Sequence, residues 1–220
     1  MSGRGAPNRE REQAHGSPQR AVVGIDEVGL APLAGPVVAC AILMPDGEQI
    51  TGVRDSKLLS RRQREYLDHL IRDVAVAWGI GAASVREIEQ FNPRAASHIA
   101  MRRAVRALER RIDRSIDYAL VDGSPAPELN ALIGPHETIV RGDTSVYSIA
   151  CASIVAKVLR DRLMAKLDLR HPGYGWANNA GYPAPVHLAA LDDLGATQHH
   201  RRTYAPVAAR IARDLGVSVS

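Results

Sequence analysis

The chain has 220 residues and a mass of 23.8 kDa, enough for one well-buried domain with a small appendage but not for two domains of equal size. Its hydrophobic fraction of 45% is ordinary for a globular protein, and no apolar run approaches the ~20 residues of a membrane-spanning helix. The 28 Lys and Arg exceed the 24 Asp and Glu, so the balance mildly favours a polyanionic partner such as nucleic acid.

Both cysteines, Cys40 and Cys151, lie in apolar stretches, and the sequence has no CxxC motif and no secretory leader pattern. We therefore expect two buried thiols in a reducing compartment, with a cytoplasmic location and a monomeric chain as the default.

Residues 1–20 contain Gly, Pro, Arg, Glu, Gln and Ser with almost no apolar side chains. Such a composition cannot offset its own ordering entropy, so we predict a disordered, slightly basic tail here.

After the tail, β-branched and apolar runs alternate with amphipathic stretches. Two early strands form a predicted hairpin, and capping boxes at Ser60 and Ser84 begin helices. The predicted strands cover residues 21–26, 36–44, 74–83, 116–122 and 137–140, and further helices follow Asn92 and cover 148–169 and 186–194. This interleaving indicates an α/β fold with a mixed sheet flanked by helices.

The helix after Asn92 carries six arginines, which favour a solvated face, with a nucleic-acid contact as the less common alternative. They are Arg94, Arg102, Arg103, Arg106, Arg110 and Arg111.

Three predicted strands end in acids next to glycine: Asp26 and Glu27, Asp122, and Asp143. If these strands are neighbours, four carboxylates converge, and such repulsion requires protonation or cations. An all-oxygen set favours Mg²⁺ or Mn²⁺, and two such ions can support phosphodiester hydrolysis. Adjacent strand residues point to opposite faces, so Asp26 and Glu27 share a metal only if the strand bends or ends there. The alternative is chance, because some of the 24 acids will fall at strand ends anyway.

With these residues and the stretches around them, the chain closely resembles bacterial ribonuclease HII, the type 2 ribonuclease H. The matching stretches follow one another through nearly everything after the tail. They are GIDEVG with PLAGPVV (24–38), DSKLLS (55–60), VDG (121–123), RGD with SIACASIVAKVLRDRLM (141–164), HPGYGW (171–176), GYPAPVHLAAL (181–191) and HHRRTYAPV (199–207).

The resemblance implies a ribonuclease H-like catalytic domain over residues 21–172 and a small C-terminal helical extension over 173–220 that contributes to substrate binding. It implies an endonuclease that cleaves the RNA strand of RNA–DNA hybrids and single ribonucleotides embedded in duplex DNA. The expected cofactors are Mg²⁺ or Mn²⁺, two per site, and the expected products carry 3′-hydroxyl and 5′-phosphate ends.

The family's metal-binding and catalytic carboxylates correspond to Asp26, Glu27 and Asp122. The fourth acid corresponds to Asp143, with Asp161 as a rival, because Asp161 also follows the small residues of the helix over 148–169. We favour Asp143, since its loop matches the family pattern and Asp161 can pair with Arg160 or Arg162.

The family's substrate-binding roles extend to the turn at Gly29, Leu30 and Ala31 and to a tyrosine that stacks on the sugar at the RNA–DNA junction, here Tyr182. A purely structural tyrosine is the alternative for Tyr182. Phosphate-contact roles correspond to Ser56, Lys57, Arg141, Ser148 and Lys157.

The turn departs from the family's usual Gly-Arg-Gly, whose backbone reads the ribose 2′-hydroxyl. Leu30 removes a cation, and Ala31 is incompatible with the turn if that position needs a positive φ. The alternative function is therefore a catalytically weak nucleic-acid-binding relative with altered junction recognition. An acid–base sugar hydrolase is disfavoured, because only 4% of the residues are aromatic.

Overall fold

The computed structural model describes residues 6–216, which divide into two compact units. The first unit comprises residues 6–28, 38–82 and 97–158, and the second comprises residues 29–37, 83–96 and 159–216. This division differs from the boundary expected after residue 172, because the loop between the first two strands clusters with the C-terminal helices.

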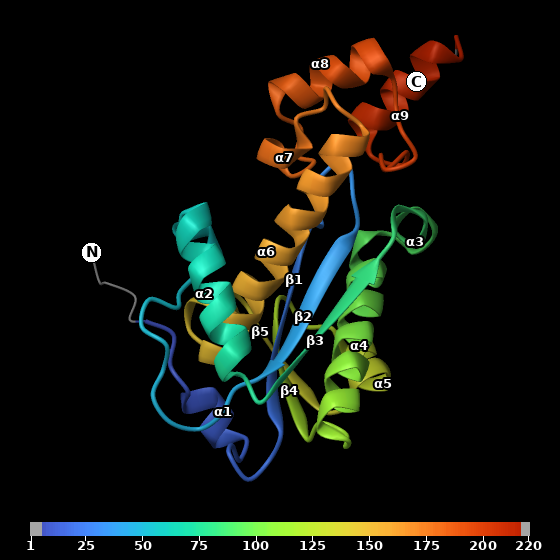
Figure 1. Cartoon of the computed structure of the whole chain (residues 1–220). Helices are drawn as coiled ribbons and strands as arrows, with labels where there is room; N and C mark the ends of the chain where they lie inside the picture. Colours follow the sequence, from blue (N-terminus) through green and yellow to red (C-terminus); the bar gives the residue numbers. More distant parts are fainter. Residues whose placement is uncertain (1–5, 217–220) are drawn as a thin grey trace, which may run out of the picture. The chain divides into compact units, whose positions relative to one another are not determined.

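One five-stranded mixed sheet has the order β3-β2-β1-β4-β5 (Figure 1). β1 pairs antiparallel with β2 and parallel with β4, and β4 pairs parallel with β5. The predicted hairpin and all five predicted strands are confirmed to within a few residues. Their bounds are β1 Val22–Val28, β2 Val37–Leu43, β3 Ala77–Ala83, β4 Tyr118–Asp122 and β5 His136–Ile139.

Both predicted capping boxes are present. Ser60 and Gln63 cap α2 (Arg61–Val74), and Ser84 and Glu87 cap α3 (Val85–Phe91). α4 (Pro93–Ile112) packs closely on β3, because a Cβ at Gly81 would lie 2.0 Å from the carbonyl oxygen of Ala100. The short helix α5 (Asn130–Ile133) precedes β5.

The arginines of α4 are not all solvated as expected. Arg111 lies 3.9 Å from the ring centroid of Trp78, and Arg103 donates a hydrogen bond to the carbonyl of Ala82. These two therefore cover β3, where they strengthen the packing of the helix on the sheet.

α6 (Tyr147–Arg170) packs on β1, and in the first unit it covers the face of the sheet opposite α4 (Figure 1). A Cβ at Gly24 would lie 2.3 Å from the carbonyl carbon of Ser148, so only glycine permits this approach. Val22, Leu120 and Ile149 form the core between them. The small residues at the start of this helix predicted such close packing.

The predicted disordered tail is wrong for the part of it that the structure describes, since residues 6–20 contain the helix α1 (Glu10–Ala14). Glu12 is 5% exposed, and the imidazole of His15 stacks on Tyr118 with a centroid distance of 3.9 Å. The segment has few apolar side chains, so its composition predicts disorder. Its polar side chains nevertheless have specific partners elsewhere in the chain. Residues 1–5 lie outside the described residues.

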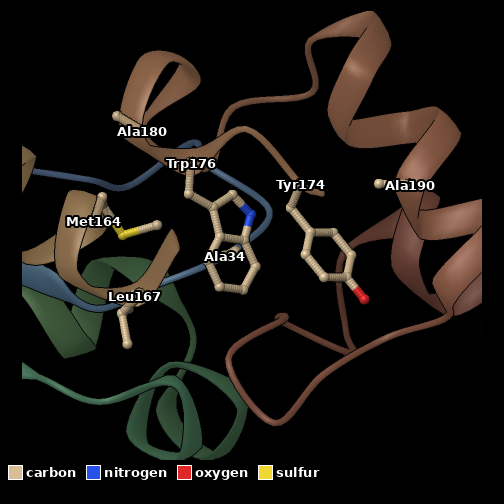
Figure 2. Packing of buried hydrophobic residues seen from close by; sticks show 7 residues of the cluster. All are labelled: Ala34, Met164, Leu167, Tyr174, Trp176, Ala180 and Ala190. Carbon is tan, nitrogen blue, oxygen red and sulfur yellow. The ribbon is translucent and has the colours of Figure 1, made fainter. Parts of the chain in front are cut away.

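The second unit is built on the end of α6 and the helices α7 (Trp176–Asn179), α8 (Pro185–Leu194) and α9 (Ala205–Asp214). Figure 2 shows its core, where the Trp176 ring lies among Met164, Leu167 and Ala34. Tyr174 stacks on Trp176 at a centroid distance of 5.0 Å. The helices expected near the C-terminus are therefore present.

Cys40 and Cys151 are both buried and not bonded to each other, as predicted. Among residues 6–216, none of the helices combines the length and apolarity that crossing a membrane requires.

Candidate active site

Asp26 and Asp122 lie beside each other where the pairing of β1 with β4 stops. The last paired residues of β1 and β4 are Ile25 and Val121, and each is followed directly by an acid. Gly24 faces α6, and strand side chains alternate, so Asp26 and Asp122 project on the α6 face. Asp26 accepts a hydrogen bond from Ser153 of α6.

Glu27 follows Asp26 in the sequence, and β1 continues to Val28 rather than ending at the acid pair. Its pairing with β2 continues through Glu27 and Val28, whereas its pairing with β4 stops at Ile25. Glu27 therefore lies beyond the last residue of β1 that pairs with β4. Its carboxylate interacts electrostatically with that of Asp122. One Glu27 carboxylate oxygen, Oε2, is buried and has no hydrogen-bond partner among the described residues.

Asp143 is brought to the same end of the sheet by a turn after β5. The backbone N–H of Gly142 donates a 2.6 Å hydrogen bond to Oδ1 of Asp122, which ties the turn to β4. Arg141 begins the turn in the left-handed conformation with φ 57°. The Lys57 ammonium group lies 3.5 Å from Oδ2 of Asp143.

The four carboxylates form one interacting electrostatic group. Burial raises the pKa of Asp26 well above its usual range, and Glu27, Asp122 and Asp143 raise it further. Burial raises the pKa of Glu27 to about 7, with Asp122 adding to the effect. The pKa of Asp122 is raised by burial and by Asp143, and burial raises that of Asp143 despite the opposing charge of Lys57. Such a cluster is typical of a functional site.

Lys57 is the cation that the cluster itself supplies. Burial alone would lower its pKa, but Asp143, Asp55 and Asp26 together hold the pKa above its ordinary value. One lysine cannot balance four acids, so the group has a deficit of positive charge when all four are ionised.

Asp161, the rival for the fourth acid, belongs to the second unit and acts electrostatically on Arg160. Asp143, in contrast, acts on both Asp26 and Asp122. Asp143 is therefore the acid that interacts with Asp26 and Asp122 within the first unit.

The donor chemistry of the cluster fits a hard divalent cation. All its ligating atoms are carboxylate oxygens, and the buried Oε2 of Glu27 lacks a partner among the described residues. Within residues 6–216, however, no three His, Cys, Asp or Glu side chains already converge on one point that could hold an ion.

Two of the expected phosphate contacts have buried side chains. Ser56 is 5% exposed, and its hydroxyl group lies 3.0 Å from that of Ser153, which hydrogen-bonds Asp26. Ser148 is 1% exposed, and its N–H donates to Glu12. The Ser56 hydroxyl is therefore linked to Asp26 through Ser153, whereas the buried Ser148 hydroxyl has no hydrogen-bond partner among the described residues.

The other expected phosphate contacts are more accessible. The Lys57 side chain is 80% exposed, Arg141 is exposed, and Lys157 is half-buried on α6.

The second unit holds the turn at Gly29, Leu30 and Ala31. Gly29 has φ +101°, and a Cβ there would lie 2.3 Å from Nε of Arg160, so glycine is required. Leu30 and Ala31 are exposed. Ala31 is not among the described residues with positive φ, so its Cβ is compatible with the turn, contrary to the concern raised by the sequence.

Two buried arginines, which the sequence analysis missed, support this turn. Arg201 donates hydrogen bonds to the carbonyl groups of Gly29, Leu30 and Gly35. Arg160 donates to those of Ala34, Pro36 and Ala180, and burial lowers its pKa to about 10. Arg201 lies in a stretch that matches the family, but the sequence held no signal that its partners are carbonyls of the first loop.

Tyr182 also belongs to the second unit and is 43% exposed. Its carbonyl group accepts a 2.8 Å hydrogen bond from Nδ1 of His187, so Nε2 of His187 is the acceptor for Trp176 Nε1 at 3.1 Å. The backbone of Tyr182 is thus held through His187 by Trp176, which belongs to the hydrophobic core shown in Figure 2. The N–H of Leu33 donates to the carbonyl of Gly181. This hydrogen bond joins the loop that contains Gly29, Leu30 and Ala31 to the loop that contains Tyr182.

Comparison with known proteins adds an independent finding. The family model described as Ribonuclease HII matches residues 23–207, which is most of the chain. The chain belongs to the ribonuclease HII family.

Curated members of the ribonuclease HII family are similar along nearly their whole length. Ribonuclease HII of Paracoccus denitrificans (strain Pd 1222) is 48% identical over 196 residues, covering 89% of this chain and 90% of that protein. Ribonuclease HII of Polynucleobacter necessarius is 47% identical over 186 residues, covering 84% and 93%.

Solved structures agree with the ribonuclease H-like fold expected for this family. The ribonuclease H2 crystal structure from Pyrococcus horikoshii OT3 is 26% identical, with a TM-score of 0.72, and the match covers 87% of this chain and 97% of that one. A structure titled as Bst-RNase HIII in complex with Mn²⁺ is 15% identical, with a TM-score of 0.70 and coverage of 91% and 72%, and it supports the fold alone. The family resemblance and the fold class predicted from the sequence are therefore confirmed, and the protein is a ribonuclease H-type hydrolase.

Proposed function

We propose that this ribonuclease HII family member is an endonuclease that hydrolyses the RNA strand of RNA–DNA hybrids and cuts at single ribonucleotides within duplex DNA. The family supports the general activity on RNA–DNA hybrids. The observation that supports the assignment of the chemistry is the interacting group of Asp26, Glu27, Asp122 and Asp143 in the first unit.

In this proposal the four carboxylates hold one or two divalent cations, Mg²⁺ or Mn²⁺. When bound, such ions make a water molecule a better nucleophile and stabilise the departing oxygen of a phosphodiester. The water oxygen attacks phosphorus and the P–O3′ bond breaks, which leaves a 3′-hydroxyl and a 5′-phosphate end.

The residues of the chain orient this reaction. Lys57, exposed and 3.5 Å from Asp143, can contact a substrate phosphate, and Arg141 and Lys157 add positive charge in the same unit. The N–H of Gly142 donates to Oδ1 of Asp122 and so holds this carboxylate in place.

The turn at Gly29, Leu30 and Ala31 is the proposed reader of the 2′-hydroxyl, together with Tyr182 stacking on the sugar. The C=O and N–H groups of a peptide point in opposite directions, so the carbonyls bonded to Arg201 direct the N–H groups of Leu30 and Ala31 away from it. Those N–H groups have no acceptor among the described residues and are able to donate to a hydroxyl group.

The test uses three end-labelled substrates: an RNA–DNA hybrid, a DNA duplex with one ribonucleotide, and the same duplex in DNA alone. We expect cleavage of the first two in Mg²⁺ or Mn²⁺, none in EDTA, none of the DNA duplex, and 5′-phosphate products. Binding without cleavage in either metal would overturn the proposal in favour of the catalytically weak relative.

A further inference from the structure

The N-terminal segment, residues 6–15, lies before the region matched by the family model, which begins at residue 23. The expectation of a disordered tail gave it no role. In the structure its Asn8, Arg9 and Glu12 contact one short stretch of the first unit, residues 145–148, which directly follows the turn of Asp143 (residues 142–144) and includes the start of α6.

The backbone contacts involve Asn8, which pairs with Val146 as an isolated parallel bridge. The N–H of Asn8 donates to the carbonyl of Ser145 at 3.0 Å, and its own carbonyl accepts from the N–H of Tyr147 at 2.9 Å. Asn8 thus makes backbone hydrogen bonds to the residues on either side of Val146, as a residue in a parallel strand pair does.

The side-chain contact involves Glu12, which is 5% exposed. Its Oε1 accepts a 2.8 Å hydrogen bond from the N–H of Ser148, in the first turn of α6. The first N–H groups of a helix have no partner within it, and a carboxylate there also interacts favourably with the helix dipole. The Arg9 guanidinium lies 4.7 Å from the ring centroid of Tyr147, which adds a second contact at the same helix end.

The stretch that these residues hold is linked directly to the acids. The N–H groups of Ser145 and Val146 donate to the carbonyl of Gly142, at 3.0 and 2.8 Å. The N–H of Gly142 in turn donates to Asp122. A displacement of residues 145–148 would therefore move the turn that carries Asp143 and would loosen its hydrogen bond to Asp122.

We propose that residues 6–15 act as a clamp that fixes the Asp143 turn against β4 and the start of α6, with Asn8 and Glu12 as positioning residues. The effect on metal binding rests on the proposed function, because it requires Asp143 to be a ligand. The effect on the rigidity of the turn is independent of the proposed function. Neither Asn8 nor Glu12 touches the reacting atoms.

The first experiment measures amide hydrogen exchange of residues 142–150 in the metal-free full-length protein. We expect Glu12→Ala to speed exchange at Tyr147 and Ser148 by about tenfold, within the range for loss of a helix N-cap. Glu12→Gln keeps an acceptor oxygen and should restore most of the protection. Glu10→Ala, on the exposed side of α1, is the matched control and should leave exchange unchanged.

A second pair of variants tests the backbone contact. Asn8→Pro removes the N–H that donates to Ser145, whereas Asn8→Ala keeps both backbone groups. We expect faster exchange at residues 145–147 in the proline variant only. Equal protection in wild type, Glu12→Ala and Asn8→Pro would overturn the clamp, whatever the activity of the protein.

The third measurement is calorimetric titration of the same variants with Mn²⁺, followed by kcat and KM on an RNA–DNA hybrid. Glu12→Ala should weaken Mn²⁺ binding several-fold and lower kcat with little change in KM, and Glu12→Gln should recover both. Faster exchange with unchanged Mn²⁺ affinity would overturn the positioning role. Absence of Mn²⁺ binding and cleavage in the wild type would contradict the proposed function and leave the exchange result to judge the clamp.

Discussion

The guanidinium group of Arg201 donates a hydrogen bond to the carbonyl oxygen of Gly29, which lies 172 residues earlier in the chain. Arg201 is fully buried, and it also holds the carbonyls of Leu30 and Gly35. The turn proposed to recognise the 2′-hydroxyl therefore owes its shape to a residue near the C-terminus. The four acids, in contrast, belong to the other unit.

Replacing Arg201 by Lys should impair recognition more than chemistry. A lysine cannot serve three carbonyls in the same fork geometry, and each carbonyl left without a donor costs about 1–3 kcal/mol. We expect a lower melting temperature and a larger loss of cleavage on the single-ribonucleotide duplex than on the RNA–DNA hybrid. Arg202→Lys, at the exposed neighbouring position, is the control.

Tyr204→Phe provides a milder form of the same test. The Tyr204 hydroxyl donates to the carbonyl of Leu30 and accepts from Arg201. Its removal should keep the fold and shift the ratio of the two cleavage rates in the same direction as Arg201→Lys. An unchanged ratio in both folded variants would show that the turn does not depend on this support.

Leu30→Arg should improve cleavage at a single ribonucleotide, because it restores a cation on an exposed turn close in sequence to the acids. Ala31→Gly should change little, since Ala31 already has a compatible φ. Steady-state rates on the single-ribonucleotide duplex and on the all-RNA strand check both variants. If wild type already cuts the two substrates with equal ease, the hypothesis of weakened junction recognition fails.

The metal-free protein should lose stability as the pH rises from about 4.5 to about 7. Glu27 has an ordinary pKa of 4.5 in the unfolded chain and a pKa of about 7 in the folded one, so the folded state binds more protons between these values. Each pKa unit corresponds to about 1.4 kcal/mol. Urea unfolding in EDTA at several pH values measures the slope.

Glu27→Gln should flatten that slope, because the amide does not titrate. Glu48→Gln, at an exposed position, serves as the matched control and should keep the wild-type slope. Identical slopes in the two variants would mean that the pKa of Glu27 in the folded protein is not raised above its value in the unfolded chain.

Much of the fold follows from local patterns in the sequence. The capping boxes at Ser60 and Ser84 and the apolar runs before Asp26 and Asp122 predict their elements because each signal is complete within a few residues. The same strand ends predict that acids gather, since neighbouring strands end at one edge of the sheet.

The rest depends on partners distant in sequence. Glu12 is polar and its neighbours are polar, so composition predicts disorder, yet its partner is a helix N-terminus 136 residues away. Ser148 is a candidate phosphate contact by position, but the close approach of α6 to Gly24 buries it. Long-range contacts of this kind have no local signature.

The carboxylates of the first unit are the proposed centre of cleavage, and comparing Asp122→Asn with Asp161→Asn on a single-ribonucleotide duplex in Mn²⁺ tests this most directly. Loss of an outer-shell partner of a metal costs 10–100-fold, so loss of a ligand should cost at least about 100-fold. We predict that Asp122→Asn abolishes cleavage while duplex binding survives, and that Asp161→Asn cuts at a rate close to wild type. Cleavage by Asp122→Asn at the wild-type rate would contradict the account.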